Sequence, residues 1–180
     1  KLGRDSCFIA LGGGVTIDLI GFIAATYMRG VALIYIPTTL LAMIDAAIGG
    51  KNAINTAHGK NLVGTFYFPY KIYYDFQWLS NLPKKEWINA TAEIIKYAIT
   101  LCYDLFLQLE NGLDQDNLNQ TMKLVRTCIS LKHQIVSCDS VEQIGTRSIL
   151  NFGHTIGHAL EKITDFQITH GEAVAIGMLV

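Results

Sequence analysis

A chain of 180 residues, of which 51% are hydrophobic and only 16% charged, contains enough apolar sequence for a sizeable core and is not intrinsically disordered. Its net charge of −1 and the lack of a long basic run argue against nucleic acid or an anionic membrane as a partner. The longest apolar runs, such as Leu19–Met28, are too short to cross a bilayer. Four scattered cysteines without CxxC spacing predict reduced, buried thiols in a cytosolic protein.

The first third of the chain predicts a βαβ unit. Cys7–Leu11 is a short apolar run typical of a buried strand, and it ends at Gly12-Gly13-Gly14. Val15–Met28 has helical spacing of its apolar residues, and Val31–Ile36 predicts a second buried strand that Pro37 stops. A strand, a glycine turn, a helix and a strand in this order predict part of a parallel sheet.

The pattern changes near Leu82-Pro83. Before this point, Thr38–Ile48 predicts a helix, Gly49 to Gly64 a long polar loop and Lys71–Asp75 one more strand. After it, strand signals vanish, and four helices are predicted: Lys85–Glu110, Asn117–Asp139, Glu142–Ile163 and Ala173–Val180. We therefore expect an α/β domain over residues 1–82 and an all-α domain over residues 83–180.

A histidine-rich stretch near the end of the chain predicts a site. His154 and His158 are four residues apart, so they share one face of a helix, and Asn151 is predicted on the same face. His170 follows, and Glu93 is a carboxylate within an apolar helical stretch upstream. Two histidines and a carboxylate, with one position open, are the usual ligands of catalytic zinc. Histidines that are hydrogen-bonded within a core explain the spacing equally well.

Two segments of the α/β half are suited to binding anions. Gly12-Gly13-Gly14 lies where glycines let a helix N-terminus approach a phosphate, although a tight turn needs the same residues. Asp18, one turn later, either accepts a hydrogen bond from a ribose hydroxyl or is an ordinary negative charge in the first turn that interacts favourably with the helix dipole. Lys51 and Lys60 each adjoin a glycine in a segment that also contains Asn61, which suits phosphate or carboxylate oxygens as well as a solvated surface.

Charged residues in the helical half allow two interpretations. Glu93 and Lys96 are three residues apart, which is the spacing of a surface ion pair, but their neighbours are apolar and favour a buried polar site. Lys132 and Arg147 are either surface charges or readers of a substrate carboxylate.

Six segments together resemble the 3-dehydroquinate synthase family, in the family's order and at nearly its spacing. The resemblance implies an NAD-binding α/β domain, here partial, followed by an all-α metal-binding domain. It also implies that the chain is a fragment of a longer protein. The segments are residues 12–30, 36–55, 59–69, 92–98, 150–161 and 170–178.

The reaction that the resemblance implies converts 3-deoxy-D-arabino-heptulosonate 7-phosphate to 3-dehydroquinate and phosphate, in the shikimate pathway to aromatic amino acids. Bound NAD oxidises a ring alcohol, zinc assists the elimination of phosphate, the hydride returns and an aldol step closes the ring. A cytoplasmic homodimer is implied. The alternatives are another sugar-phosphate cyclase, a metal-dependent polyol dehydrogenase and an inactive fragment. Lys132 and Arg147 argue against uncarboxylated substrates, and the NFGHTIGHA stretch argues against a simple dehydrogenase.

Matched residue by residue, the resemblance implies that Glu93, His154 and His170 bind zinc, with cobalt as a possible substitute. His158 then becomes a proton-transfer residue instead of a ligand. The residues matched to the NAD site are Gly13, Gly14, Val15, Thr16, Ile17, Asp18, Thr38, Thr39, Asp45, Lys51, Lys60, Trp78, Leu79, Ser80 and Asn81.

The residues matched to the sugar-phosphate site have several roles. Lys51, Asn61 and Asn151 match contacts on the phosphate side, and Lys96 lines the site. Lys132 and Arg147 match the carboxylate readers, and Arg29 matches a residue that crosses the dimer interface. Two departures occur. Asn52-Ala53 replaces the family's Thr-Gly, and Asp139–Gly145 is one residue longer, which leaves the alignment open between Lys132 and His133.

Overall fold

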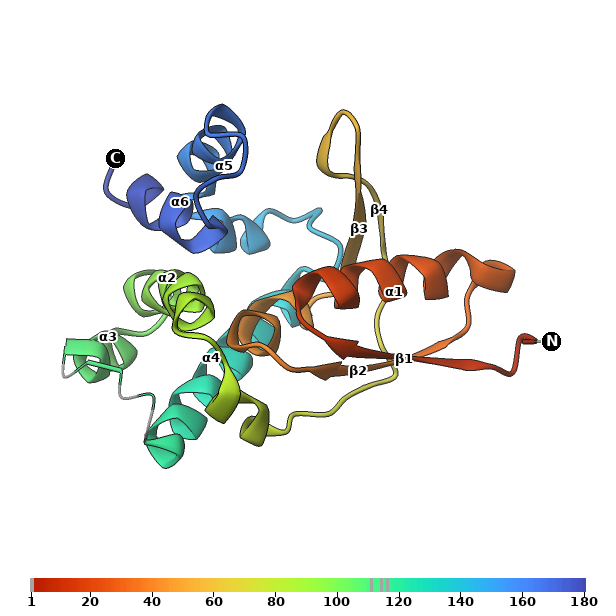
Figure 1. The fold of residues 1–180 in the computed structure, drawn as a ribbon, viewed down its shortest axis with the longest axis horizontal. Helices are drawn as coiled ribbons and strands as arrows, with labels where there is room; N and C mark the ends of the chain where they lie inside the picture. The colour runs from red at the N-terminus through yellow and green to blue at the C-terminus, as the bar shows by residue number, and fades with distance from the viewer. Residues whose placement is uncertain (1, 111, 114, 116) are drawn as a thin grey trace. The chain divides into compact units, whose positions relative to one another are not determined.

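The computed structural model describes residues 2–110, 112–113, 115 and 117–180. The chain divides into two compact units, Lys1–Leu79 and Ser80–Val180, close to the boundary predicted at Leu82-Pro83 (Figure 1). Within the described residues, no helix is both long enough and apolar enough to cross a membrane.

The first unit contains the predicted βαβ arrangement. Its sheet has the order β1-β2-β5, and both pairings are parallel, so the prediction of a parallel sheet is confirmed. Helix α1 connects β1 to β2, as the glycine turn predicts. The elements are β1 (Cys7–Gly12), α1 (Gly14–Thr26), η1 (Tyr27–Arg29), β2 (Ala32–Pro37) and β5 (Lys71–Ile72).

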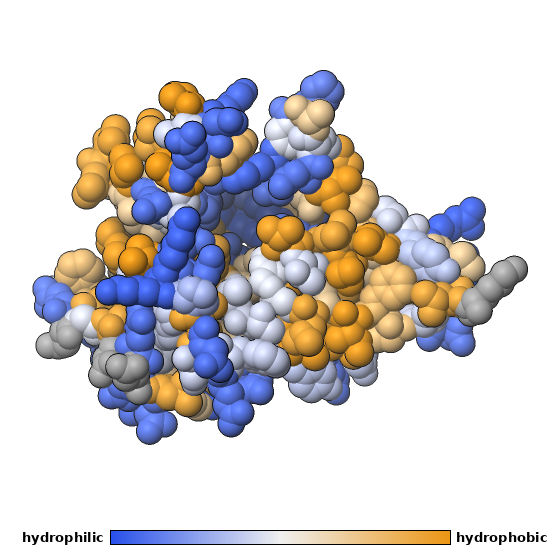
Figure 2. Space-filling view, in the orientation of Figure 1, coloured by the Kyte–Doolittle hydropathy of each residue, from blue (hydrophilic) through white to orange (hydrophobic). Residues whose placement is uncertain are grey.

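The core of this unit lies between α1 and the sheet. Ile17 and Ala24 of α1 are fully buried with Leu33 and Tyr35 of β2, because residues one or two turns apart on a helix share the face that meets the strands. The other face of α1 presents exposed apolar side chains, seen as the hydrophobic area over α1 in Figure 2. They are Val15, Leu19 and Ile23.

The prediction that β1 is a buried strand is wrong for most of its length. Ala10 is buried, but Ile9 and Leu11 on the opposite face are more than half exposed. The reason is that α1 covers only the face to which Ala10 belongs, which leaves Ile9 and Leu11 exposed on the other face.

The segment predicted as a long polar loop is a β-hairpin instead. Strand β3 (Lys51–Thr56) pairs antiparallel with β4 (Gly59–Phe66), and the register is irregular between Ile54 and Thr56. Lysine, asparagine and glycine are uncommon in strands, which is why the local sequence indicates a loop. The hairpin is fixed by contacts that are distant in sequence.

Asn52 provides those contacts at the base of the hairpin. Its side-chain amide donates to the carbonyls of Gly50 and Tyr67 at 2.9 and 2.8 Å, and its oxygen accepts from the buried Tyr35 hydroxyl. A Cβ added at Gly21 of α1 would lie 1.9 Å from that oxygen. The departure from the family sequence at this position is therefore a buried asparagine that joins the hairpin, the sheet and α1.

Other elements of the first unit are shorter than predicted. The helix predicted over Thr38–Ile48 is reduced to a short helical segment that ends in the π-helical turn η2 (Ala42–Ala46). Only the first two residues of the predicted strand Lys71–Asp75 pair with the sheet. A short 3-10 segment, η3 (Phe76–Asn81), follows and contains the boundary between the two units.

The second unit is helical, as predicted, and its described residues contain no strand. Two predicted helices are interrupted. Lys85–Glu110 breaks after Thr100, where Tyr97 O accepts from the N–H groups of both Leu101 and Cys102. Glu142–Ile163 is helical only in two parts. The elements are α2 (Lys84–Thr100), α3 (Tyr103–Glu110), α4 (Leu118–Cys138), η4 (Thr146–Asn151), α5 (His154–Ile163) and α6 (His170–Gly177).

The cysteines differ from the prediction in their burial. All four are free thiols, and Cys128 is buried, but Cys7 and Cys138 are exposed. The prediction of buried thiols is therefore wrong for these two. Both lie at the end of an element, Cys7 at the start of β1 and Cys138 at the last residue of α4, where neighbouring elements cover less of the chain.

Candidate functional site

The three predicted metal ligands lie together in the second unit. Glu93 of α2 is fully buried, and its Oε1 lies 3.6 Å from Nε2 of His154 and 3.7 Å from Nε2 of His170. Zinc–ligand bonds near 2.0–2.1 Å in a tetrahedral site place neighbouring ligand atoms roughly 3.3 Å apart. The two distances from Glu93 Oε1 exceed this spacing by only a few tenths of an ångström, and all three ligand atoms lie within 4.8 Å of one another, so the donor set fits a shared divalent cation.

Local backbone geometry directs His154 into this group. His154 is the first residue of α5 and follows Gly153, whose φ of 79° lies in the left-handed region and turns the chain between η4 and the helix. Its Nδ1 lies 3.1 Å from the Phe152 carbonyl oxygen. An Nδ1–H that donates to this carbonyl leaves Nε2, the atom that faces Glu93, with a free lone pair.

His170 is held by the N-terminus of α6. Thr169 and Glu172 form a reciprocal capping box, in which each side chain accepts from the other residue's backbone N–H. The hydrogen bonds from Thr169 lower the pKa of the Glu172 carboxyl. The backbone N–H of Gly171, the residue after His170, donates to the side-chain oxygen of Asn89 in α2 at 2.6 Å. The first turn of α6 is thereby attached to the helix that carries Glu93.

Lys96 forms a buried ion pair with Glu93. Both side chains are inaccessible, and Lys96 Nζ donates to Glu93 Oε2, so the interpretation as a surface ion pair is wrong. Burial lowers the pKa of His154, and the nearby charge of Lys96 lowers it further. Burial also acts to lower the pKa of His170, but contacts with Glu93 and Glu161 outweigh it and raise that pKa overall.

His158 lies beside this group without facing Glu93. It is exposed, and its ring centroid is 5.3 Å from that of His154 and 6.1 Å from that of His170. The two histidines share a helical face, as their spacing predicts. Spacing alone pairs His154 with His158, whereas His154 and His170 are the two that meet the carboxylate.

Asn151 does not share the helix of His154. It belongs to η4, on the other side of the turn at Gly153, so the prediction of a continuous helical face is wrong. Its side-chain amide donates to Glu142 Oε1 at 3.2 Å.

The two predicted carboxylate readers are buried cations. Lys132 of α4 is 6% exposed and Arg147 of η4 is 2% exposed, so the interpretation as surface charges is wrong for both. His133, the alternative to Lys132 in the alignment, is exposed on α4. Elements α4 and η4 pack against each other and against α2. Arg147 Nη1 donates to the Ser140 carbonyl at 2.9 Å.

Asp139 organises the loop that carries Arg147, and the sequence analysis missed this role. Its Oδ1 accepts from the N–H groups of Gln143 and Ile144, and its Oδ2 accepts from those of Gly145 and Arg147. Burial acts to raise the pKa of this carboxyl, but the four hydrogen bonds outweigh it and lower the pKa overall. An aspartate at a helix end shortly before a glycine is the available signal.

Asp139→Asn is expected to lower the midpoint of thermal unfolding by roughly 5 °C or more, since the amide turns two donors toward backbone N–H groups. The lowered pKa means that the carboxylate stabilises the fold fully above the unfolded value of about 3.9 and loses this effect at lower pH. Thermal unfolding of the wild type and of Asp139→Asn at pH 7 measures the effect of the substitution, and the same comparison at pH 3 measures how much of that effect is lost in acid. Ser140→Ala is the control, because it keeps the backbone carbonyl of Ser140 that accepts from Arg147. Equal midpoints for wild type and Asp139→Asn at pH 7 would contradict this role.

In the first unit, the glycine turn meets the residues that follow β2. The Thr38 N–H donates to the Gly12 carbonyl at 2.9 Å, and a Cβ added at Gly13 would lie 3.1 Å from the Thr39 methyl group. The carboxyl ends of two adjacent parallel strands thus converge beside the start of α1, where Gly13 has no side chain to cap the helix. This arrangement suits a dinucleotide pyrophosphate.

The other residues predicted for the NAD and phosphate contacts are spread over several elements. Burial raises the pKa of Tyr35, and the charge of the nearby Asp18 raises it further. The remaining residues have these positions: Val15, Thr16 and Ile17 in α1, Arg29 in η1, Asp45 in η2, Lys51 in β3, Lys60 and Asn61 in β4, and Trp78, Leu79, Ser80 and Asn81 in η3. Ile17 belongs to the core, so its side chain is not available to a ligand.

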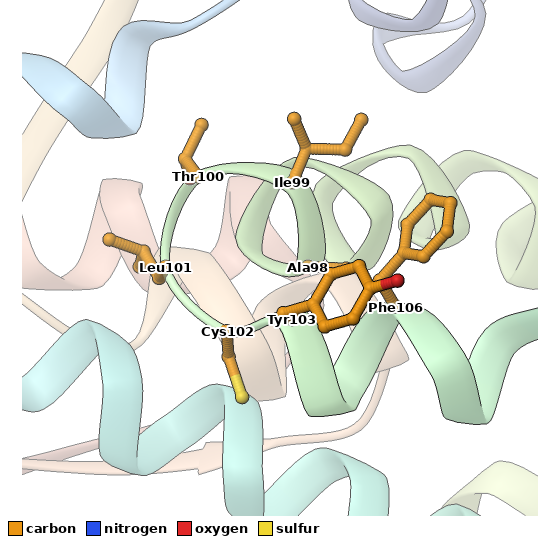
Figure 3. Close-up of a pocket in the computed structure, with 7 residues that line it drawn as sticks. All are labelled: Ala98, Ile99, Thr100, Leu101, Cys102, Tyr103 and Phe106. Carbon is orange, nitrogen blue, oxygen red and sulfur yellow. The ribbon is translucent and has the colours of Figure 1, made fainter.

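A separate hollow of about 420 Å³ lies where α2 ends and α3 begins (Figure 3). Its lining is mostly apolar and includes the stacked rings of Tyr103 and Phe106, whose centroids are 6.0 Å apart. It contains none of the residues predicted for the site. The group around Glu93 therefore remains the candidate functional site of the second unit.

Comparison with known proteins shows the family. Residues 1–89 match the N-terminal part of 3-dehydroquinate synthase, and residues 90–180 match its C-terminal part. The 3-dehydroquinate synthase of Thermoanaerobacter sp. (strain X514) is 51% identical over an alignment 180 residues long, which covers 98% of this chain and 50% of the relative. The chain spans about half the length of the curated relatives it matches.

Solved structures agree with this result. A 2-deoxy-scyllo-inosose synthase in complex with carbaglucose-6-phosphate, NAD+ and Co2+ is 34% identical with a TM-score of 0.85, covering 99% of this chain and 49% of that one. A 2-epi-5-epi-valiolone synthase from Streptomyces hygroscopicus with NAD+ and Zn2+ is 30% identical with a TM-score of 0.91, covering 98% and 51%. With both halves matched in order, the chain belongs to the 3-dehydroquinate synthase family.

Proposed function

We propose that this chain is part of a 3-dehydroquinate synthase, an NAD- and zinc-dependent lyase that converts 3-deoxy-D-arabino-heptulosonate 7-phosphate to 3-dehydroquinate and phosphate. The observation that carries the proposal is the meeting of Glu93, His154 and His170 in a chain that is 51% identical to a curated synthase. Related cyclase structures contain NAD+ with Co2+ or Zn2+, which supports the cofactors.

The metal and the dinucleotide have separate tasks in this proposal. Zinc would polarise substrate hydroxyls as a Lewis acid, and NAD would accept a hydride and return it. Glu93, His154 and His170 would hold the metal, and Lys96 donates to the second oxygen of Glu93. His158 is exposed beside them, where an imidazole can move a proton to or from the substrate.

The first unit binds NAD in this proposal. The turn at Gly13 and Gly14 presents the N-terminus of α1 to the pyrophosphate, with Thr38 and Thr39 alongside. Lys51 lies on β3, and Lys60 and Asn61 lie on β4; in this proposal they would bind phosphate oxygens of the ligands.

A second candidate is another sugar-phosphate cyclase, and the likeness to the 2-deoxy-scyllo-inosose and valiolone synthases favours it. The buried cations Lys132 and Arg147 distinguish the two candidates. Both match the carboxylate-binding residues of the family, and only the heptulosonate phosphate carries a carboxylate that they could bind. We therefore prefer the carboxylated substrate. A cytoplasmic location and a homodimer in which Arg29 crosses the interface stay predictions from the family resemblance.

The test is phosphate release by the full-length protein from the heptulosonate phosphate, with NAD present. We expect release that stops after treatment with EDTA, returns with added zinc and produces no net NADH. A polyol dehydrogenase would instead accumulate NADH. If the metal-loaded protein releases no phosphate from the heptulosonate phosphate but turns over uncarboxylated sugar phosphates, it belongs with the other sugar-phosphate cyclases.

A further inference from the structure

Glu161 is a second buried carboxylate that contacts a proposed metal ligand. It lies on α5, is 5% exposed, and its Oε2 is 3.4 Å from Nδ1 of His170. The other nitrogen of the same ring, Nε2, is 3.7 Å from Oε1 of Glu93. The imidazole of His170 therefore lies between two carboxylates, one at each nitrogen.

The two contacts call for opposite states of the two nitrogens. A nitrogen that binds a metal must offer a lone pair, and the other nitrogen then carries the proton. Metal-binding histidines usually donate that N–H to a carboxylate or carbonyl, which fixes the tautomer and the orientation of the ring. His154 has a backbone carbonyl in this position, from Phe152. For His170 the corresponding acceptor is Glu161.

We propose that Glu161 is the positioning residue of the metal centre, which accepts the Nδ1–H of His170 and so presents Nε2 to the metal beside Glu93 and His154. The proposal rests on the metal-dependent function proposed above. It gives the family's metal site in this chain a partner on each histidine: a carbonyl for His154 and a carboxylate for His170.

Glu161 could instead be a metal ligand itself, because His158, Glu161 and His170 form a second group with donor atoms close together. The geometry favours the positioning role. Nδ1 is the nitrogen of His170 that lies 3.4 Å from Glu161, and a metal bound there would leave the proton on Nε2, so that His170 could not also serve the group around Glu93. The group around Glu93 also has the fully buried carboxylate, whose Oε1 already faces two Nε2 atoms.

The test compares Glu161→Gln and Glu161→Ala in the full-length protein, with Glu110→Gln at the exposed end of α3 as the matched control. Zinc affinity is measured by competition with a chromophoric chelator. We expect Glu161→Ala to weaken zinc binding about 10–100-fold. Glu161→Gln should lose less, because its amide oxygen can still accept from Nδ1. Glu110→Gln should bind as the wild type does. Wild-type affinity in both Glu161 variants would overturn the proposal.

Two spectroscopic measurements separate positioning from ligation and from a merely structural role. The visible absorption of the cobalt-loaded protein should keep its band positions in Glu161→Gln and change them in His170→Ala. Nitrogen-15 NMR of the zinc-loaded wild type should find His170 protonated at Nδ1. A shift of the cobalt bands in Glu161→Gln like that in His170→Ala, or a proton at Nε2, would overturn the proposal.

A failure of the wider function is recognised separately. If the wild type binds no zinc, the proposed metal centre itself is wrong, and the positioning role falls with it. If the wild type binds zinc and His154→Ala does not, the centre stands, and the Glu161 variants alone decide the positioning role. Thermal unfolding of the metal-free proteins checks that Glu161→Gln is folded.

Discussion

Replacing Glu93 with glutamine is expected to weaken zinc binding by more than about 100-fold and to reduce phosphate release by at least the same factor. Loss of an indirect partner of a metal ligand typically costs 10–100-fold in affinity, so loss of a direct ligand should cost more. Glutamine keeps the shape of the side chain but removes the negative charge whose Oε1 faces both histidines. Chelator competition and a phosphate-release assay measure the two effects.

The same substitution disturbs a buried ion pair, and a double variant separates the two consequences. Glu93→Gln leaves the buried Lys96 charge without its carboxylate, a kind of loss that costs roughly 3–5 kcal/mol of stability. Adding Lys96→Met removes the second charge, and apolar replacements of whole pairs are often neutral. We expect the double variant to regain thermal stability while zinc binding stays lost. Glu86→Gln, in the first turn of the same helix, is the control. Tight zinc binding by the double variant would contradict the assignment of Glu93 as a zinc ligand.

Local sequence was sufficient for the parts of the fold that local rules determine. The glycine turn after Cys7–Leu11 and the apolar spacing of the next segment predict β1, α1 and β2. They do so because the residues of each element carry the periodicity that identifies it. The absence of strand signals after Pro83 likewise predicts the helical second unit. Errors occur at element ends, where a single backbone angle decides. Gly153 in the left-handed region divides what the periodicity indicates as one helix.

The hairpin was missed because its stability is not local. Its residues are typical of a loop, and the pairing depends on the buried amide of Asn52, which meets Tyr35 of another strand and lies against Gly21 of α1. A buried asparagine with its hydrogen bonds satisfied cannot be distinguished from a solvated one by its neighbours in sequence.

The site was predictable in its residue types but not, from spacing, in its pairing. Helical spacing pairs His154 with His158, whereas α6 brings His170 to the carboxylate instead. Only the family resemblance assigns His170, because that contact depends on how α6 packs on α2. Asp139 and Glu161 were missed for a similar reason: each acts on backbone or on another side chain and lies in an unremarkable polar context.

The packing of α6 is the basis of the second large prediction. A Cβ added at Gly171 would lie 2.0 Å from the Asn89 carbonyl oxygen, and one at Gly177 would lie 2.0 Å from the Gly153 carbonyl oxygen. Both clashes are with backbone, which cannot rotate away as a side chain can. We expect Gly171→Ala and Gly177→Ala to destabilise the protein by about 3 kcal/mol each, at the upper end of the usual cost of overpacking.

The two variants should differ in their effect on the metal. Gly171 follows His170 directly, and its N–H donates to Asn89, so a shift of this turn moves a proposed ligand away from Glu93. Gly177 is at the other end of α6, seven residues from His170. Relief of its clash would move that end of α6 away from Gly153, the residue before His154. We expect Gly171→Ala to weaken zinc binding more than Gly177→Ala, and chelator competition on the folded proteins compares them.

Gly157 provides the graded control for this argument. Its added Cβ would lie 3.2 Å from the backbone of Ala173, a tight contact that a shift of a few tenths of an ångström relieves. Gly157→Ala should therefore lower the unfolding midpoint less than either other substitution. If all three variants unfold at the wild-type temperature, α6 is not held by close backbone contact, and the position of His170 must depend on its side-chain contacts with Glu93 and Glu161 alone. If the order of destabilisation follows the contact distances, the glycines set the approach of α6, and that approach sets the metal site.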